Sequence, residues 1–138
     1  MDSAKLLEAL DRQAGEAGRT LRALVQVNVS GERSKSGLAP AAAPAVLALA
    51  NRLRHVQVVG LMTIPPLAED PETARPFFRK LRERRDAWAA ETGLELPELS
   101  MGMTHDLDVA VEEGATFVRV GTGIFGARAR PAPETEET

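Results

Sequence analysis

The fold is decided by residues 99–123, LSMGMTHDLDVAVEEGATFVRVGTG, which contain two short loops. The loops are Ser100-Met101-Gly102-Met103-Thr104 and Gly121-Thr122-Gly123, and each follows an apolar, strand-like run and leads into a helix-like one. Amide hydrogens at the start of a helix point outward, the helix dipole adds about half a positive charge, and glycine lets a ligand approach the backbone. Two such loops from consecutive strands predict one phosphate held from two sides.

Hydrophobic periodicity predicts that helices and strands alternate along the chain. It predicts helices over 3–17, 39–54, 70–92 and 105–113, and strands over 21–29, 56–64, 98–102 and 117–121. Pro40 and Pro44 fit only in or before the first turn of the second helix, and Asp70-Pro71 predicts a capped helix start. Strict alternation with mainly apolar strands predicts a parallel sheet with right-handed crossovers.

Two parallel α/β folds fit this pattern: an open doubly wound sheet and a (β/α)8 barrel. The loops favour the barrel, because barrels often bind phosphate after their last two strands with the help of a short extra helix, for which residues 124–128 are available. We therefore predict the C-terminal half of a (β/α)8 TIM-type barrel, about four βα units with parallel strands, over residues 1–130. Residues 131–138 are predicted to form a disordered acidic tail.

A half barrel has two unpaired strand edges, which are unfavourable for an isolated chain. We therefore expect either that an N-terminal half is missing from this chain or that the chain associates with itself through its open barrel edges. The start at Met1-Asp2-Ser3 suggests a truncated gene or gene model.

The composition of the chain limits which classes of binding partner are expected. The 138 residues are 43% hydrophobic, which indicates one globular domain, and the net charge of -3 comes without any basic stripe, so no nucleic-acid partner is expected. There is no cysteine, and His55 and His105 lack metal-ligand spacing, so no metal site is predicted. No signal pattern and no apolar run of about 20 residues occurs, so we expect no membrane association and a cytoplasmic location.

Four motifs occur in order along the chain. They are Asn28-Val29-Ser30 with Ser34-Lys35-Ser36-Gly37, then Gly60-Leu61-Met62-Thr63-Ile64, then Leu99 to Thr104 with Asp106, and finally Val118 to Thr122 leading to Ile124-Phe125-Gly126. On these motifs residues 2–129 resemble the YggS/PROSC family of pyridoxal phosphate homeostasis proteins. The resemblance implies the barrel domain of fold-type III enzymes such as alanine racemase and pyridoxal 5'-phosphate (PLP) as the cofactor. It also implies a role in vitamin B6 and amino-acid homeostasis without established catalytic turnover.

The resemblance also implies which residues bind the cofactor. The phosphate would be held by Ser100, Gly102, Met103, Thr104, Gly121 and Thr122. Arg119 would lie near the pyridine nitrogen, Met62 near the ring, and Asn28 within reach of the ligand. Structural alternatives stay open: the glycines serve turns, Thr104 caps the short helix, Arg119 pairs with a carboxylate, and Met62 belongs to the core.

No catalytic residue is predicted, because the family's Schiff-base lysine lies upstream of everything present here. The only lysines are Lys5, Lys35 and Lys80, and none matches its position. A racemase-like PLP enzyme fragment is an alternative, but it needs a tyrosine base and the chain has none. A further alternative is that the chain is a fragment with only residual phosphate binding. The arginine run Arg79, Arg82, Arg84 and Arg85 is predicted to be a solvated helix face.

Overall fold

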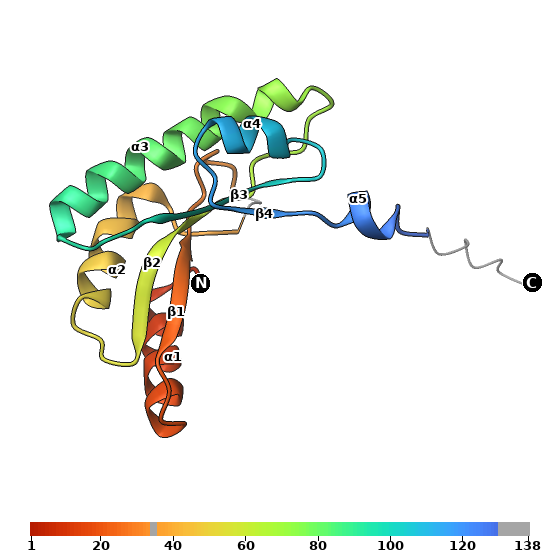
Figure 1. The fold of residues 1–138 in the computed structure, drawn as a ribbon. Helices are drawn as coiled ribbons and strands as arrows, with labels where there is room; N and C mark the ends of the chain where they lie inside the picture. Colours follow the sequence, from red (N-terminus) through yellow and green to blue (C-terminus); the bar gives the residue numbers. More distant parts are fainter. Residues whose placement is uncertain (34–35, 130–138) are drawn as a thin grey trace, which may run out of the picture.

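A four-stranded parallel sheet with strand order β1-β2-β3-β4 forms the centre of the computed structural model, which describes residues 1–33 and 36–129 (Figure 1). The strands are β1 (Leu21–Gln26), β2 (Val56–Met62), β3 (Glu98–Met103) and β4 (Phe117–Arg119). The helices are α1 (Ala4–Glu16), α2 (Ala43–Ala50), α3 (Arg75–Thr92), α4 (Leu107–Glu112) and α5 (Thr122–Phe125), and 3-10 turns η1 (Pro40–Ala42) and η2 (Pro71–Ala74) precede α2 and α3. This confirms the predicted alternation and parallel fold class. The tail predicted over 131–138 lies outside the described residues.

The helix boundaries follow from local chemistry. Ser3 caps α1, since its Oγ accepts a hydrogen bond from the Leu6 amide at 3.1 Å, and an Asp70 oxygen accepts from the Glu72 amide at 2.9 Å. Pro40 and Pro44 lie in the first turns of η1 and α2, where their missing amide hydrogens cost nothing. Two predicted helices begin as 3-10 turns, and a proline, Pro40 or Pro71, is the first residue of each turn.

The strand predicted over 21–29 is shorter in the structure and ends at Gln26. Beyond Gln26 the chain pairs with Leu38: the Leu38 amide donates to the Gln26 carbonyl and the Leu38 carbonyl accepts from the Asn28 amide, both at 2.8 Å. Three helix predictions were also wrong in extent, and the first of these, over 39–54, ends at Ala50. The helix predicted over 105–113 contracts to α4, and the short helix predicted over 124–128 begins earlier, because the Ile124 and Phe125 amides both donate to the Gly121 carbonyl.

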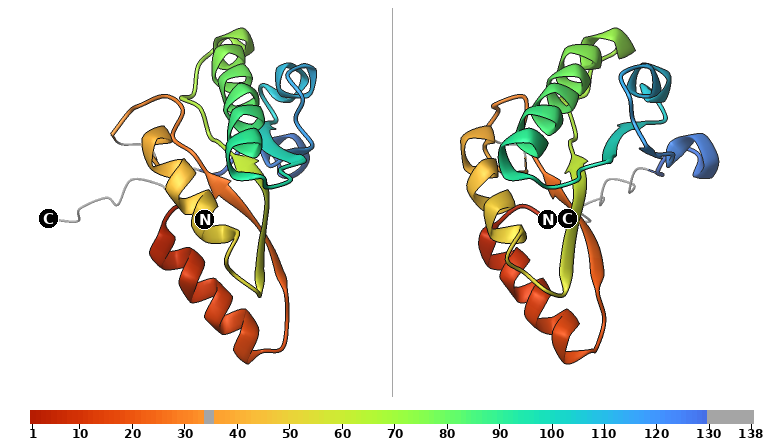
Figure 2. Two further views of the ribbon diagram at one scale, coloured as in Figure 1. Left: turned by 90° about the vertical axis from the view of Figure 1, so that its left-hand side faces the viewer. Right: turned by 60° about the vertical axis from the view of Figure 1, so that its left-hand side comes forward.

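The helices lie on one face of the sheet. Figure 2 shows α1, α2 and α3 on one side of β1 and β2, with no helix over the other side. On the helical side Val25, Leu61 and Leu99 of three neighbouring strands are fully buried and pack into one core with Leu47 and Phe78. The opposite face of the sheet, the inner face of a barrel, is left without a covering layer in the part of the chain that the structure describes.

The two edges of the sheet differ, which corrects the expectation that both are open. Along β1, the Met1 ammonium donates to the Leu24 carbonyl at 2.9 Å, and the Met1 carbonyl accepts from the Gln26 amide at 2.8 Å. Met1 and Leu38 thus cover the carboxyl-terminal part of this edge. The stretch from Arg22 to the Leu24 amide remains uncovered by the described residues, as does the outer edge of β4.

The arginine run on α3 is only in part the solvated face that was predicted, because Arg79 and Arg84 are exposed whereas Arg82 and Arg85 are half-buried. The buried carboxylate of Glu113, just after α4, is in salt bridges with Arg75 at 3.2 Å, Arg79 at 3.0 Å and Arg82 at 3.0 Å. These bonds lower the pKa of Glu113, with the hydrogen bond from Arg79 as the largest cause. The cluster fastens the end of α4 to α3. Because α4 directly follows the first glycine loop, the cluster also positions that loop.

Candidate functional site

The two glycine loops meet at the carboxyl ends of β3 and β4, as predicted from their positions in the sequence. They line a cavity of about 610 Å³ with Met103 and Thr104 from one loop and Gly121 and Thr122 from the other. The remaining walls are Leu67, His105, Phe125, Gly126, Ala127 and Arg128. In (β/α)8 barrels this end of the strands carries the active site. The structure therefore brings four of the six predicted phosphate ligands into one cavity.

One hydrogen bond joins the two loops directly. Thr104 Oγ1 accepts from the Gly123 amide at 3.1 Å, across 19 residues of sequence. The structural alternative, in which Thr104 caps α4, is therefore wrong. The Thr104 side chain instead binds the first turn of α5. The start of α4 is organised by Asp106, whose Oδ1 accepts from the Met103 amide at 2.8 Å.

Donors for an anion remain at this junction. Among the described residues the amide hydrogens of Thr104, Gly121 and Thr122 have no acceptor. A hydroxyl has one donor hydrogen as well as its acceptor lone pairs, so Thr104 still has its hydrogen to offer after accepting from Gly123. Neutral donors on residues that line one cavity suit a phosphate, which brings its own charge and three strong acceptor oxygens.

Gly102 explains how the first loop comes so close to α4. Its φ of +97° is a left-handed conformation that favours glycine, and an added Cβ would lie 2.5 Å from the Cβ of Ala110. The glycine lets the end of β3 pack directly on α4. A turn role and a phosphate role are therefore compatible at this position, because the close packing sets where the following amides point.

Arg119 lines a second, adjoining cavity of about 320 Å³. The rest of its wall is Ile64, Pro65, Pro66, Leu67, Gly102, Met103, His105 and Asp106. Arg119 donates from Nη2 to the Thr63 carbonyl at 3.3 Å, while its Nε is buried and has no hydrogen-bond partner. Burial lowers the pKa of Arg119, and the charge of Asp106 opposes that shift. No salt bridge to Arg119 occurs among the described residues, so a structural ion pair does not account for it.

Three predicted ligands lie outside both cavities. Ser100 is buried within β3 and pairs with Met62 of β2, so these two residues sit one layer below the loops. Asn28 organises the loop after β1: its Oδ1 accepts from Ser30 Oγ at 3.0 Å and from the Gly31 amide at 3.1 Å, and its Nδ2 donates to the Glu32 carbonyl at 2.7 Å. Their contacts with a ligand stay predictions.

The two lysines among the described residues lie away from both cavities. Lys5 is exposed on α1, and Lys80 on α3 donates to the Val29 carbonyl at 3.4 Å. Neither lines either cavity. Lys35 lies outside the described residues.

Sequence reasoning missed some residues of the site. Leu67 and His105 line both cavities, and Asp106 lines the second, although the sequence offered only a lone histidine and a helix-start acid. Thr63 is buried, donates from its hydroxyl to the Val27 carbonyl at 2.8 Å and accepts from Arg119 with its own carbonyl. Its signal was present in the Gly60 to Ile64 motif, where a threonine interrupts an apolar strand.

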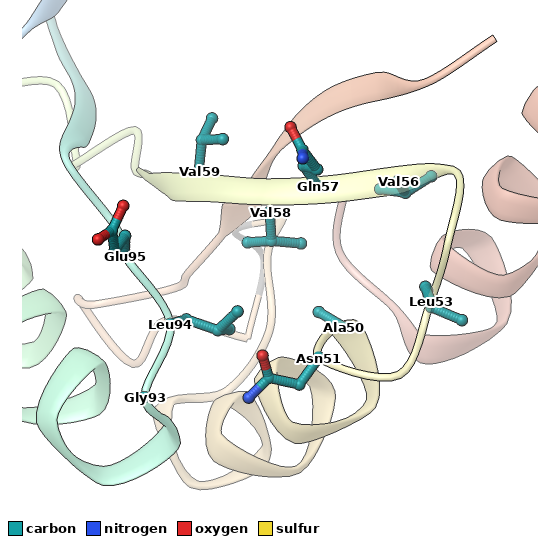
Figure 3. Close-up of a pocket in the computed structure, with 10 residues that line it drawn as sticks. All are labelled: Ala50, Asn51, Leu53, Val56, Gln57, Val58, Val59, Gly93, Leu94 and Glu95. Atoms are coloured by element: carbon teal, nitrogen blue, oxygen red, sulfur yellow. The ribbon is translucent and has the colours of Figure 1, made fainter.

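A further hollow of about 390 Å³ lies at the opposite, amino-terminal end of β2 (Figure 3). Figure 3 shows Val58 pointing toward α2, while Gln57 and Val59 point away from it. The hollow arises because β3 pairs with β2 only from Gly60 onward. That end of a barrel contributes to stability rather than to chemistry, so we do not place the functional site there.

Two further classes of site were searched for in residues 1–33 and 36–129. These residues contain no group of three or more histidine, cysteine, aspartate or glutamate side chains that could hold a metal ion. None of their helices is long and apolar enough to cross a membrane.

Residues 1–129 match the family model described as alanine racemase, N-terminal domain. The chain is 46% identical over 128 residues to a protein of Aquifex aeolicus named pyridoxal phosphate homeostasis protein, covering 93% of this chain and 56% of that protein. A protein of the same name from Pseudomonas aeruginosa is 41% identical over 133 residues, with 96% and 56% covered. The chain thus spans little more than half the length of these relatives.

A solved structure of a relative is also similar to this chain. PipY of Synechococcus elongatus, determined with PLP bound, superposes with a TM-score of 0.84 at 40% identity, over 91% of this chain and 58% of PipY. The four-stranded sheet and its helices are therefore similar to part of a larger protein whose structure holds PLP.

Proposed function

The chain belongs to the alanine racemase N-terminal domain family, and on that premise we propose that it binds PLP by its phosphate where β3 and β4 end. Its role is then in vitamin B6 and amino-acid homeostasis, without catalytic turnover, in the cytoplasm. Residues 1–130 act as one partial barrel domain in this proposal.

The observation that carries the proposal is the convergence of two loops whose unpaired amides line one cavity. The amides of Thr104, Gly121 and Thr122 and the hydroxyls of Thr104 and Thr122 donate to the phosphate. Held from two strands, the phosphate is fixed in position as well as bound. Gly102 and Met103 shape the first loop, and Ser100 supports it from within β3.

The ring of PLP would extend toward the second cavity, where Arg119 lies. Its unpartnered Nε and the cation it carries suit the pyridine nitrogen of a bound ring, because that nitrogen is a hydrogen-bond acceptor when unprotonated. Met62 and Asn28 complete the expected contacts on the side of β1 and β2. When bound, PLP supplies an aldehyde that condenses with amines, and this chain offers no lysine among its described cavity residues to receive it.

Binding is therefore non-covalent in this proposal. A racemase-like enzyme is the weaker candidate, since it requires a lysine and a tyrosine as opposing bases and the chain has no tyrosine. We also propose that the chain's partner is a second copy of itself, engaged through the open edges of the sheet, and that it has neither a nucleic-acid nor a membrane partner.

Equilibrium dialysis tests the proposal by comparing PLP with pyridoxal, which lacks the phosphate. We expect the protein to retain PLP but not pyridoxal. Inorganic phosphate should compete with PLP for the site. Thr122→Val removes one hydroxyl and should weaken PLP binding several-fold, about 1 kcal/mol for one hydrogen bond. Thr20→Val, at an exposed position far from the cavities in sequence and structure, is the matched control.

Equal retention of PLP and pyridoxal would contradict a phosphate site, as would equal affinities of the two valine variants. Borohydride reduction followed by peptide mass spectrometry checks the non-covalent part. A PLP adduct on Lys5, Lys35 or Lys80 at the occupancy seen in dialysis would overturn it.

A further inference from the structure

We propose that His105 adds a pH-dependent positive charge to the phosphate site, so that the site holds an anion more tightly when the imidazole is protonated. This inference rests on the proposed phosphate site and extends it by one binding residue. It does not involve the edges of the sheet or either end of the chain.

His105 borders three adjoining hollows at the carboxyl end of the sheet. It lines the cavity of about 610 Å³ where the two glycine loops meet and the cavity of about 320 Å³ that contains Arg119. A third hollow, of about 460 Å³, is lined by His105 together with Leu67, Ala68 and Glu69 from the segment after β2. A ligand that fills the first cavity therefore meets the side chain of His105.

The backbone around His105 is held in a tight turn. The Met103 amide donates to Asp106 Oδ1 at 2.8 Å, and the Asp106 amide donates to the Met103 carbonyl at 3.1 Å. These two hydrogen bonds span Thr104 and His105. The point from which the imidazole side chain starts is therefore fixed relative to the first glycine loop.

The imidazole of His105 has no structural partner. Within residues 1–33 and 36–129 the side chain is exposed and makes no hydrogen bond or ion pair. The start of α4 is organised by the neighbouring Asp106 instead. Both ring nitrogens thus remain available, and a protonated imidazole has two N–H donors to offer an anion.

The first cavity is lined by no acid that would cancel a charge on His105. Its other charged lining residue is Arg128, which is cationic at any pH the protein tolerates. Histidine, in contrast, changes its charge between pH 5 and 8. Protonation of His105 therefore adds a second positive charge to the walls of a cavity whose other phosphate donors are neutral amides and hydroxyls.

Other charged groups surround His105 in the adjoining hollows. Asp106 and Arg119, of opposite sign, line the second hollow, Glu69 lines the third, and Asp108 lies in the first turn of α4. Glu69 is exposed, and an ion pair in water contributes little. A phosphate brings up to two charges and is already held beside His105 by the loops, so it is the preferred partner of the protonated ring.

Comparison of His105→Asn with the unaltered chain isolates the effect of the charge. Equilibrium dialysis at pH 8 and about pH 5.5 gives the ratio of their PLP affinities, in which titration of the phosphate itself cancels because both proteins receive the same ligand. We expect a ratio near one at pH 8. At the lower pH the unaltered chain should bind about three- to five-fold more tightly, the effect of one exposed ion pair.

The other histidine of the chain provides the matched control. His55 lines neither cavity, so His55→Asn should bind PLP like the unaltered chain at both pH values. The converse variant, His105→Arg, carries a permanent charge and should bind PLP about three- to five-fold more tightly than the unaltered chain at pH 8, but equally at the lower pH. Circular dichroism at both pH values checks that each variant is folded.

Proton NMR tests the contact directly, because the chain has two histidines. Inorganic sulfate, which keeps both of its charges over this pH range, serves as the probe. At acidic pH it should shift the ring-proton signals of His105, identified by their absence from His105→Asn, and leave those of His55 unmoved. A purely structural His105 would show neither this shift nor the pH-dependent ratio.

The outcomes separate this inference from the proposed function. Retention of PLP with the same pH profile in the unaltered chain and in His105→Asn overturns the role of His105 and leaves the phosphate site standing. Failure of the unaltered chain to retain PLP at either pH contradicts the phosphate site, and the inference falls with it.

Discussion

Thr104 and Gly123 connect the two strands that carry the site: the Gly123 amide donates to Thr104 Oγ1 at 3.1 Å. The bond uses an acceptor position of the hydroxyl, so the hydroxyl hydrogen stays available to a ligand in the cavity that Thr104 lines. It also holds the two loops at a fixed separation. The affinity for phosphate should therefore depend on the hydrogen bond between Gly123 and Thr104, even though the Gly123 amide does not bind the ligand.

Gly123→Ala should weaken PLP binding about ten-fold, because the new Cβ would lie 2.8 Å from Thr104 Cγ2 and push the loops apart. Fluorescence titration with PLP measures the effect. Adding Thr104→Ser to Gly123→Ala removes that methyl group but keeps the hydroxyl, so most of the affinity should return. Failure of the serine to restore binding would show that the spacing of the loops is not what Gly123 provides.

Gly102→Ala should destabilise the fold by about 1–3 kcal/mol, since it combines a left-handed φ with a clash at 2.5 Å against Ala110. Urea denaturation followed by circular dichroism measures the free energy of unfolding. Gly114→Ala is the matched control: its φ is also left-handed, at +100°, but its nearest neighbour is a flexible Arg82 carbon at 3.5 Å. The difference between the variants isolates the cost of the clash, and equal losses would contradict close packing at Gly102.

Glu113→Gln should lower the free energy of unfolding at neutral pH by roughly 1–3 kcal/mol, because three arginines lose a buried carboxylate partner. Folding lowers the pKa of Glu113, so its contribution is present above its unfolded pKa of about 4.3 and is lost as the pH falls through the folded value. The unaltered chain should therefore lose more stability between neutral and acidic pH than the variant. Parallel pH profiles of the two would refute the assignment. Glu112→Gln, at an exposed partner of Arg75, should change little.

Arg119→Met should leave the melting temperature unchanged or raise it, while weakening PLP binding. The guanidinium is partly buried with an unpartnered Nε, and a flexible apolar side chain of similar length removes that desolvation cost. Differential scanning fluorimetry and PLP titration measure the two effects. A large fall in melting temperature would assign Arg119 to structure rather than to the ligand.

The order of helices and strands was predictable because its signals are local. Ser3, Asp70 and the prolines of η1 and α2 act on residues within one turn, and alternation of apolar segments is sufficient to indicate a parallel sheet. The pairing of the glycine loops was predictable for a related reason, since consecutive parallel strands end at the same edge of a sheet. In contrast, no periodicity indicates that Leu38 pairs with Val27 beyond the end of β1.

The sequence by itself thus determined the succession of elements, the parallel sheet and the two loops that meet at its carboxyl edge. Only the tertiary structure decided that Glu113 collects three arginines, that Met1 covers part of the β1 edge and that Thr104 accepts from Gly123. Each of these bonds joins residues 19 or more positions apart. Propensities and caps act over one turn, whereas such contacts depend on how packed layers align, and that alignment is set by the core as a whole.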